Sequence, residues 1–153
     1  MTSSRRTTAV HAAIRELQRL SEIFQRRRVQ LAREVDLTEH QWRVLEQISS
    51  EHFIPSMFAR DNESSAAAVS KTIRQLLDKE LITVSISATD GRQRDYELSA
   101  LGKQRLAALR KLRKRAIDTI WATMPESQLE DFTATAAELT ARIEAYAAKQ
   151  DKE

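Results

Sequence analysis

Residues 64–98 of the 153-residue chain, SSAAAVSKTIRQLLDKELITVSISATDGRQRDYEL, decide the fold because the spacing of their apolar residues changes once. In the first half these residues recur every three or four positions, which predicts a helix. The buried stripe of that helix would consist of Val69, Ile73, Leu76 and Leu77. From residue 82 to 88 every second residue is apolar, and the alternation returns at residues 96–98 after the turn dipeptide Asp90-Gly91. The stretch therefore predicts one helix followed directly by a β-hairpin.

Two shorter helices are predicted upstream of this stretch. Thr38 and Gln41 have the spacing of a capping box, which begins a helix with Trp42 and Leu45 on its inner face. Pro55 suits the first turn of the next helix, which we expect to end near residue 61. Three short helices followed by a hairpin are the order of a winged helix-turn-helix lobe, whose last short helix enters the major groove of DNA.

Long amphipathic helices are predicted on both sides of this lobe. Apolar residues recur at helical spacing over residues 10–35, again over residues 99–124, and again over residues 129–146. These stripes are too long to be buried on so small a lobe, so we expect them to pack against a second copy of the chain. The predicted fold is mainly α with one β-hairpin, and its parts are a dimerisation helix (1–36), a winged helix-turn-helix lobe (37–100) and C-terminal dimerisation helices (101–150).

The composition argues against several classes of protein. The chain has no cysteine, which excludes disulfides, thiol nucleophiles and thiolate zinc sites, and its two glycines cannot form a phosphate-binding loop. The three histidines are well separated, and no catalytic motif is present. We therefore predict that the protein is not an enzyme and uses no metal or cofactor. No run of about 20 apolar residues predicts a membrane span, so we expect a cytoplasmic protein without a membrane partner.

The charge of the chain is unevenly distributed. The 25 basic and 22 acidic residues give a net charge of +3, and basic residues gather between Lys103 and Arg115. Such a run can attract phosphate groups or form the solvated face of a helix. The charge pattern alone favours the solvated face.

The predicted fourth helix and the hairpin carry residues suited to DNA. Small side chains allow close approach to the groove, Lys71 and Arg74 supply charge, and Arg92 and Arg94 lie at or just beyond the hairpin tip. Arg92 could enter a minor groove, held by a charge-assisted bond to Asp90, although an ordinary surface turn explains the pattern equally well. The candidate DNA-binding residues are Ser64, Ser65, Ala67, Ala68, Ser70, Lys71, Arg74, Asp90, Arg92 and Arg94. We expect one of the two serines to cap the helix and the other to contact DNA.

Four short motifs follow one another between residues 37 and 102. They are Leu37-Thr38 with Gln41-Trp42-Arg43-Val44-Leu45, Val69-Ser70-Lys71 with Leu76 and Leu81-Ile82, Asp90-Gly91-Arg92, and Leu98-Ser99-Ala100-Leu101-Gly102. In order and separation they resemble the MarR family of bacterial transcriptional regulators. The resemblance implies an obligate homodimer built from the first and the last two helices. It also implies binding to an inverted-repeat operator, with one recognition helix in each half-site and Arg92 in the minor groove.

The chain departs from the family pattern at two positions. Glu80 stands where the family usually has glycine after the recognition helix, which predicts a C-cap that is distorted or not left-handed. Gly91 fills a position where some relatives carry another arginine, so this wing has less positive charge.

The resemblance also implies a small ligand, often phenolic or anionic, between the DNA-binding lobe and the dimerisation helices. Four residues are candidates for that site, although each of them is more often a packing or surface residue. They are His11, Arg15, His40 and Trp42.

Together the motifs predict a homodimeric, sequence-specific DNA-binding transcriptional regulator, a repressor that a ligand could release from its operator. The alternative is a winged-helix protein-interaction module, whose alanine-rich fourth helix docks into a protein groove. Reversing the charges of Arg92 and Arg94 would distinguish the two.

Overall fold

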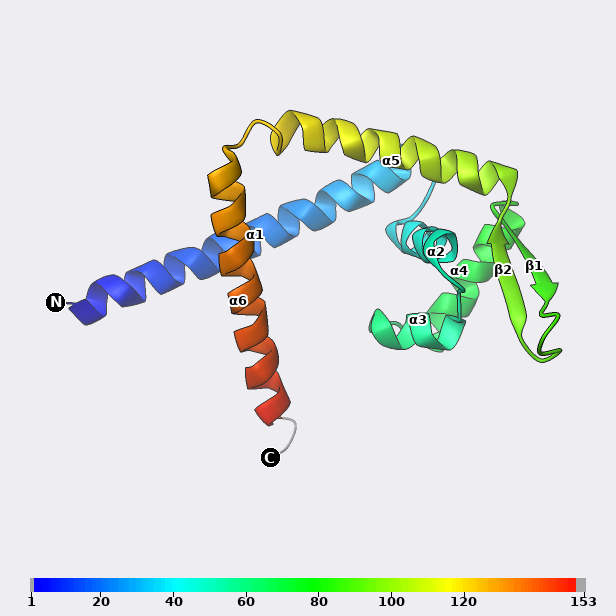
Figure 1. The fold of residues 1–153 in the computed structure, drawn as a ribbon, viewed down its shortest axis with the longest axis horizontal. Helices are drawn as coiled ribbons and strands as arrows, with labels where there is room; N and C mark the ends of the chain where they lie inside the picture. Colours follow the sequence, from blue (N-terminus) through cyan, green and yellow to red (C-terminus); the bar gives the residue numbers. More distant parts are fainter. Residues whose placement is uncertain (1, 151–153) are drawn as a thin grey trace. The chain divides into compact units, whose positions relative to one another are not determined.

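The computed structural model describes residues 2–150. Its elements are α1 (Thr2–Glu34), α2 (Glu39–Ser50), α3 (Pro55–Asp61), α4 (Ala66–Asp78), β1 (Ile82–Ile86), β2 (Arg94–Leu98), α5 (Ala100–Ile120) and α6 (Glu126–Gln150) (Figure 1). The predicted mainly α fold with one β-hairpin is confirmed. The chain divides into two compact units, residues 1–112 and residues 113–153. The finer division at residues 36 and 100 stays a prediction.

The core of the first unit lies among α2, α3, α4 and the hairpin, together with one end each of α1 and α5. The predicted capping box begins α2, since the backbone N–H of Gln41 donates to Thr38 Oγ1 and the backbone N–H of Thr38 donates to Gln41 Oε1, both at 3.1 Å. The largest fully buried side chains are Trp42, Leu45, Phe53, Leu76, Leu81, Leu106 and Leu109. The short helices are thus held by one shared core, which fixes α4 against α2 and α3.

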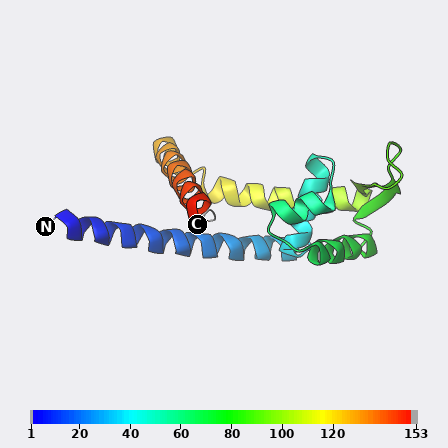
Figure 2. The ribbon, with the colours of Figure 1, turned by 90° about the horizontal axis from the view of Figure 1, so that it is seen from below.

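Most of α1 lies outside this core. Among residues 4–34 of this helix, the buried ones are Leu31 and Ala32, at its C-terminal end. The remainder extends away from α2, α3 and α4 (Figures 1 and 2). Apolar side chains on this part of the helix are 36–49% exposed: Val10, Ile14, Leu17, Leu20 and Ile23.

The second unit contains α6, in which no residue is buried. Its large apolar side chains that are most exposed, at 42–67%, are Phe132, Leu139, Ile143 and Tyr146. Among the helices of residues 2–150, none combines the length and apolar character needed to cross a membrane.

Helix α4 ends in a Schellman motif. The backbone N–H of Leu81 donates to the carbonyl of Leu76, and that of Glu80 donates to the carbonyl of Leu77, both at 2.9 Å. Glu80 itself has φ 57°, in the left-handed region. The expectation that Glu80 distorts or prevents a left-handed C-cap is therefore wrong, because these two hydrogen bonds and the burial of Leu81 impose the conformation on a non-glycine residue.

Replacing Glu80 by glycine is expected to raise the free energy of unfolding by about 1 kcal/mol. A side chain in the left-handed region costs about 1–2 kcal/mol, and the greater freedom of glycine in the unfolded chain offsets part of this gain. Urea denaturation followed by circular dichroism measures the change. Glu80→Ala is the control, because it removes the charge but keeps Cβ. Equal stabilisation by alanine would show that backbone strain is not the cause.

The wing is the antiparallel pair β1–β2, in which Val84 is opposite Tyr96 and Ile86 is opposite Arg94. The alternation seen in the sequence runs two residues beyond β1, so Ala88 lies in the loop. The ring of Tyr96 meets Phe53 edge-on, with 5.7 Å between centroids. This contact anchors the base of the wing to the core.

The start of α5 is joined to the end of α4. Ser99 Oγ donates to the carbonyl of Glu80 at 2.6 Å and accepts the N–H of Gly102 at 3.0 Å. Gly102 is buried, and a Cβ atom at this position would lie 2.0 Å from the carbonyl oxygen of Leu81. The Leu98–Gly102 motif therefore lets two backbone segments approach more closely than any side chain would allow.

Candidate nucleic-acid interface

The outward face of α4 combines small side chains with two cations. Ser65 is the N-cap and accepts the backbone N–H of Ala68 at 3.0 Å, as predicted for one of the two serines. Val69, Thr72, Ile73 and Leu76 are buried. The side chains that face outward are Ala66, Ala67, Ser70, Lys71 and Arg74, while Ala68 is half-buried. Such a surface allows close approach to a groove and offers Lys71 and Arg74 for contacts there.

Ser64, the other serine, is directed toward the protein. It is half-buried, and its hydroxyl lies 3.4 Å from Nε2 of His40. A DNA contact by Ser64 stays a prediction, but this hydroxyl already has a partner within the lobe.

The wing tip is shaped by Asp90. Its carboxylate accepts the backbone N–H of Arg92 at 3.0 Å, and its carbonyl accepts the N–H of Gln93 at 2.9 Å. Asp90 thus holds the backbone at Arg92, where the sequence had suggested a bond to the guanidinium. Within residues 2–150 the exposed Arg92 guanidinium has no ion pair, so the tip presents its charge outward. Arg94 is exposed at the first position of β2.

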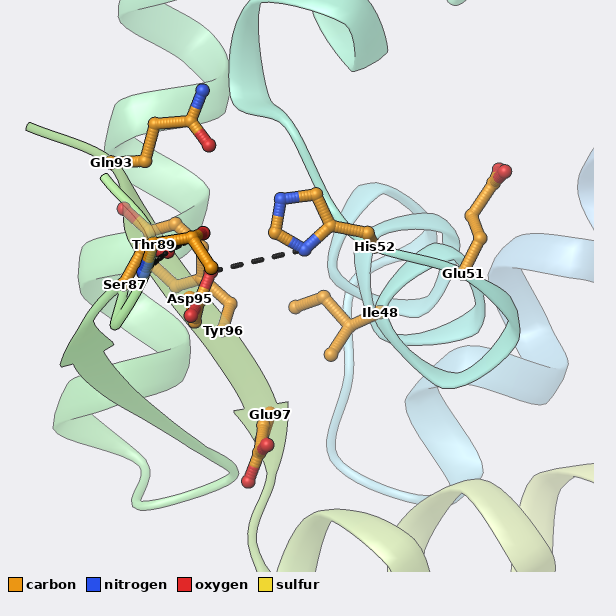
Figure 3. A pocket seen from close by; sticks show the side chains of 9 residues that line it. All are labelled: Ile48, Glu51, His52, Ser87, Thr89, Gln93, Asp95, Tyr96 and Glu97. Carbon is orange, nitrogen blue, oxygen red and sulfur yellow. Dashed lines mark hydrogen bonds and ion pairs between the residues drawn. The ribbon is translucent and has the colours of Figure 1, made fainter.

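A hollow of about 520 Å³ lies between the C-terminal end of α2 and the wing (Figure 3). His52 and Asp95 face each other across it, with 3.8 Å between Nδ1 and Oδ1. The lining residues are Ile48, Glu51, His52, Ser87, Thr89, Gln93, Asp95, Tyr96 and Glu97. The sequence did not reveal this hollow, because the two segments that form it are distant in the chain. When His52 is protonated, this partly exposed pair contributes at most about 1 kcal/mol to holding the wing.

The four ligand candidates occupy three different places. His11 and Arg15 are exposed on α1, whereas Trp42 is only 2% exposed within the core. His40 is half-buried between α2 and α4. Since a helix rises about 1.5 Å per residue, His11 lies about 30 Å along α1 from its buried end. The structure does not bring the four together within one chain, and a ligand site formed by them stays a prediction.

Trp42 also has partners within the protein. The guanidinium of Arg28 lies over its ring, 4.4 Å from the centroid, and its Nε1 donates to Glu46 at 3.2 Å. Arg28 in turn donates to Glu39 at 3.0 Å. These contacts explain Trp42 as a packing residue that joins α1 to α2.

The basic run of α5 is partly used to hold the lobe together. Arg105 donates to the carbonyl of Val35 at 2.7 Å, and Arg110 donates to Glu46 at 2.7 Å. These two side chains connect α5 to the end of α1 and to α2, a role that the charge pattern did not reveal. No group of three or more His, Asp or Glu side chains among the described residues is placed to hold a metal ion.

A recognition helix braced by two short helices and followed by an arginine-tipped hairpin defines a winged helix-turn-helix protein. Residues 35–93 match the MarR family. The family resemblance indicated by the sequence motifs is thereby confirmed for the winged-helix lobe.

Solved structures show the same fold over a longer part of the chain. The MarR family transcription regulator SP03579 superposes with a TM-score of 0.85 at 16% identity, covering 97% of this chain and 99% of that one. MepR of Staphylococcus aureus, a transcription regulator of the multidrug efflux pump MepA, superposes with a TM-score of 0.68 at 18% identity. This match covers 83% of this chain and 95% of the MepR chain. The structure of MepR in its complex with DNA superposes with a TM-score of 0.67 at 18% identity. The match covers 83% of this chain and 93% of the MepR chain. No curated protein matches the sequence significantly.

Proposed function

We propose that this protein is a sequence-specific DNA-binding regulator of transcription, a repressor that acts in the cytoplasm as a homodimer on an inverted repeat. The observation that carries the proposal is the exposed guanidinium of Arg92, on a tip whose backbone Asp90 holds. Lys71 and Arg74 on the outward face of α4 supply the second contact surface. The likeness of the fold to MepR, which has been solved in complex with DNA, supports the same function.

The exposed apolar faces of α1 and α6 support the homodimer. Each face would leave a continuous apolar stripe in water if the chain stayed alone, and monomeric proteins seldom expose large contiguous apolar patches. A second copy would cover the same surfaces on both subunits, as a two-fold interface requires. Two linked lobes would then present two recognition helices to two half-sites.

The double substitution Ile14→Glu and Leu17→Glu is expected to give monomers. Both side chains are nearly half exposed on α1, and this part of the helix adds nothing to the core of the lobe. Sedimentation equilibrium should therefore show half the mass of the unaltered protein, while circular dichroism keeps its helical signal. Arg15→Glu and Arg19→Glu introduce charge of the same sign elsewhere on α1 and serve as the control. A dimer of unchanged mass would refute the proposed role of this face.

The DNA-binding function is tested by selecting bound sequences from a random duplex library at roughly physiological salt, where non-specific binding is weak. Enrichment of an inverted repeat, with half-sites about one helical turn apart, is the expected result. Recovery of no common sequence would contradict the proposal and favour a protein-interaction module.

We further propose that a small phenolic or anionic ligand controls DNA binding. Such a ligand can release DNA only if it binds one spacing of the two lobes more tightly than the other. Its addition to the protein bound to the selected operator should then raise the dissociation constant.

A further inference from the structure

His40 of α2 lies between the recognition helix and its support, with a contact on each side. Its Nδ1 is 2.6 Å from Thr72 Oγ1 in the middle of α4, and its Nε2 is 3.4 Å from Ser64 Oγ just before the N-cap. The ring also meets Phe58 of α3 edge-on, with 5.8 Å between centroids. One imidazole therefore contacts the turn just before α4, the middle of α4, and the helix α3 that braces α4.

The chemistry of the three side chains is complementary. A neutral imidazole has one N–H donor and one acceptor nitrogen, and a hydroxyl can either donate or accept. Thr72 is 5% exposed, and His40 supplies a partner for its buried hydroxyl. Because the ring is rigid, its two nitrogens set how far Ser64 and Thr72 can lie from α2.

The surroundings of His40 favour its neutral form. Burial lowers the pKa of His40, the charge of Arg43 lowers it further, and Glu39 opposes them. The side chains that contact the ring from α3, from the turn before α4 and from α4 itself, namely Phe58, Ser64 and Thr72, carry no charge.

We propose that His40 is a positioning residue for the recognition helix, and that through Thr72 and Ser64 it determines the sequence specificity of DNA binding. This inference rests on the proposed function. Hydrogen bonds to base edges require close alignment of α4 with the groove, whereas attraction of phosphates by Lys71, Arg74 and Arg92 depends mainly on charge. Moving α4 slightly should therefore weaken binding to the operator and leave binding to unrelated DNA almost unchanged.

The test compares dissociation constants of the full-length protein for the selected operator and for a scrambled duplex at one salt concentration. His40→Leu removes both polar contacts, and Thr72→Val removes one hydroxyl with almost no change of shape. We expect each to lower the ratio of operator to scrambled affinity, by tenfold or more for His40→Leu, with scrambled binding within twofold of the unaltered protein. His40→Asn keeps an amide near the place of Nδ1 and should restore much of the ratio.

The ratio of operator affinity to scrambled affinity distinguishes a shift of α4 from a loss of folded protein. A loss of folded protein lowers both affinities by the same factor and leaves their ratio unchanged. If the unaltered protein itself does not prefer an inverted repeat, the proposed function fails. If that preference exists and persists in His40→Leu and Thr72→Val, this inference alone is overturned.

The pH dependence of stability gives a readout without DNA. The pKa of His40 is lower in the folded chain than its ordinary value of 6.5, so the unfolded chain binds the proton more readily. The resulting stability is fully present above about pH 6.5 and is lost as the pH falls through the folded-state pKa. Urea denaturation between pH 7.5 and 5.5 should therefore show a larger loss for the unaltered protein than for His40→Asn. Equal losses would contradict the buried environment assigned to this imidazole.

Discussion

Gly102→Ala is expected to lower the free energy of unfolding by about 3 kcal/mol, the cost of forcing an extra group into a filled space. The added Cβ would lie 2.0 Å from the carbonyl oxygen of Leu81. That oxygen cannot easily move, because it accepts the N–H of Ser99 at 3.1 Å while the N–H of Leu81 donates to Leu76. Relief of the clash therefore requires either α5 or the end of α4 to shift.

The direction of this effect makes the experiment decisive. Alanine within a helix is ordinarily about 1 kcal/mol more favourable than glycine, so helix propensity alone predicts stabilisation. Urea denaturation followed by circular dichroism measures the difference. The other glycine of the chain is a matched control, since a Cβ on Gly91 would have no neighbour within 4 Å. Gly91→Ala should change stability by less than about 1 kcal/mol, and a stabilising Gly102→Ala would show that α5 does not approach Leu81 this closely.

Local signals in the sequence were sufficient for much of the lobe. The spacing of Thr38 and Gln41 predicts the start of α2, and Pro55 predicts that of α3. The change of apolar spacing after α4 predicts the wing. Each of these signals depends on neighbours within a few residues, so the folded context does not alter it.

Features imposed by distant contacts could not be predicted from local signals. Glu80 adopts a left-handed conformation because the buried Leu81 and the end of α4 require it, although glutamate does not favour it. His40 was named as a ligand candidate, and its contact with Thr72 depends on how α2 crosses α4.

At the candidate nucleic-acid interface, too, the sequence identifies residues but does not reveal their contacts. The sequence identifies Arg92 as a residue at the tip of the wing, and it also singles out Asp90. It does not show that Asp90 binds the backbone N–H of Arg92 and leaves the guanidinium without an ion pair among residues 2–150. The distinction matters, because a guanidinium held by Asp90 would have to give up that bond before meeting DNA.

Arg92→Ala is expected to weaken binding to the selected operator by about a hundredfold, roughly tenfold for each of the two wings of the proposed dimer. The substitution removes an exposed side chain, and the hydrogen bond from the backbone N–H of residue 92 to Asp90 can remain. Gel shifts at a fixed salt concentration measure the affinity, and thermal unfolding should be unchanged. The slope of log affinity against log salt should also become shallower, because fewer counterions are released on binding.

Two matched variants separate the possible roles of this side chain. Arg92→Lys keeps the charge but loses the planar fork, so an intermediate affinity would indicate that the guanidinium shape contributes within the groove. Asp90→Ala keeps Arg92 and frees the backbone of the tip, and it should weaken binding less than Arg92→Ala. Unchanged affinity in Arg92→Ala would refute the wing assignment. Since Arg94 is also exposed but belongs to β2, a loss confined to Arg94→Ala would instead place the contact on the strand.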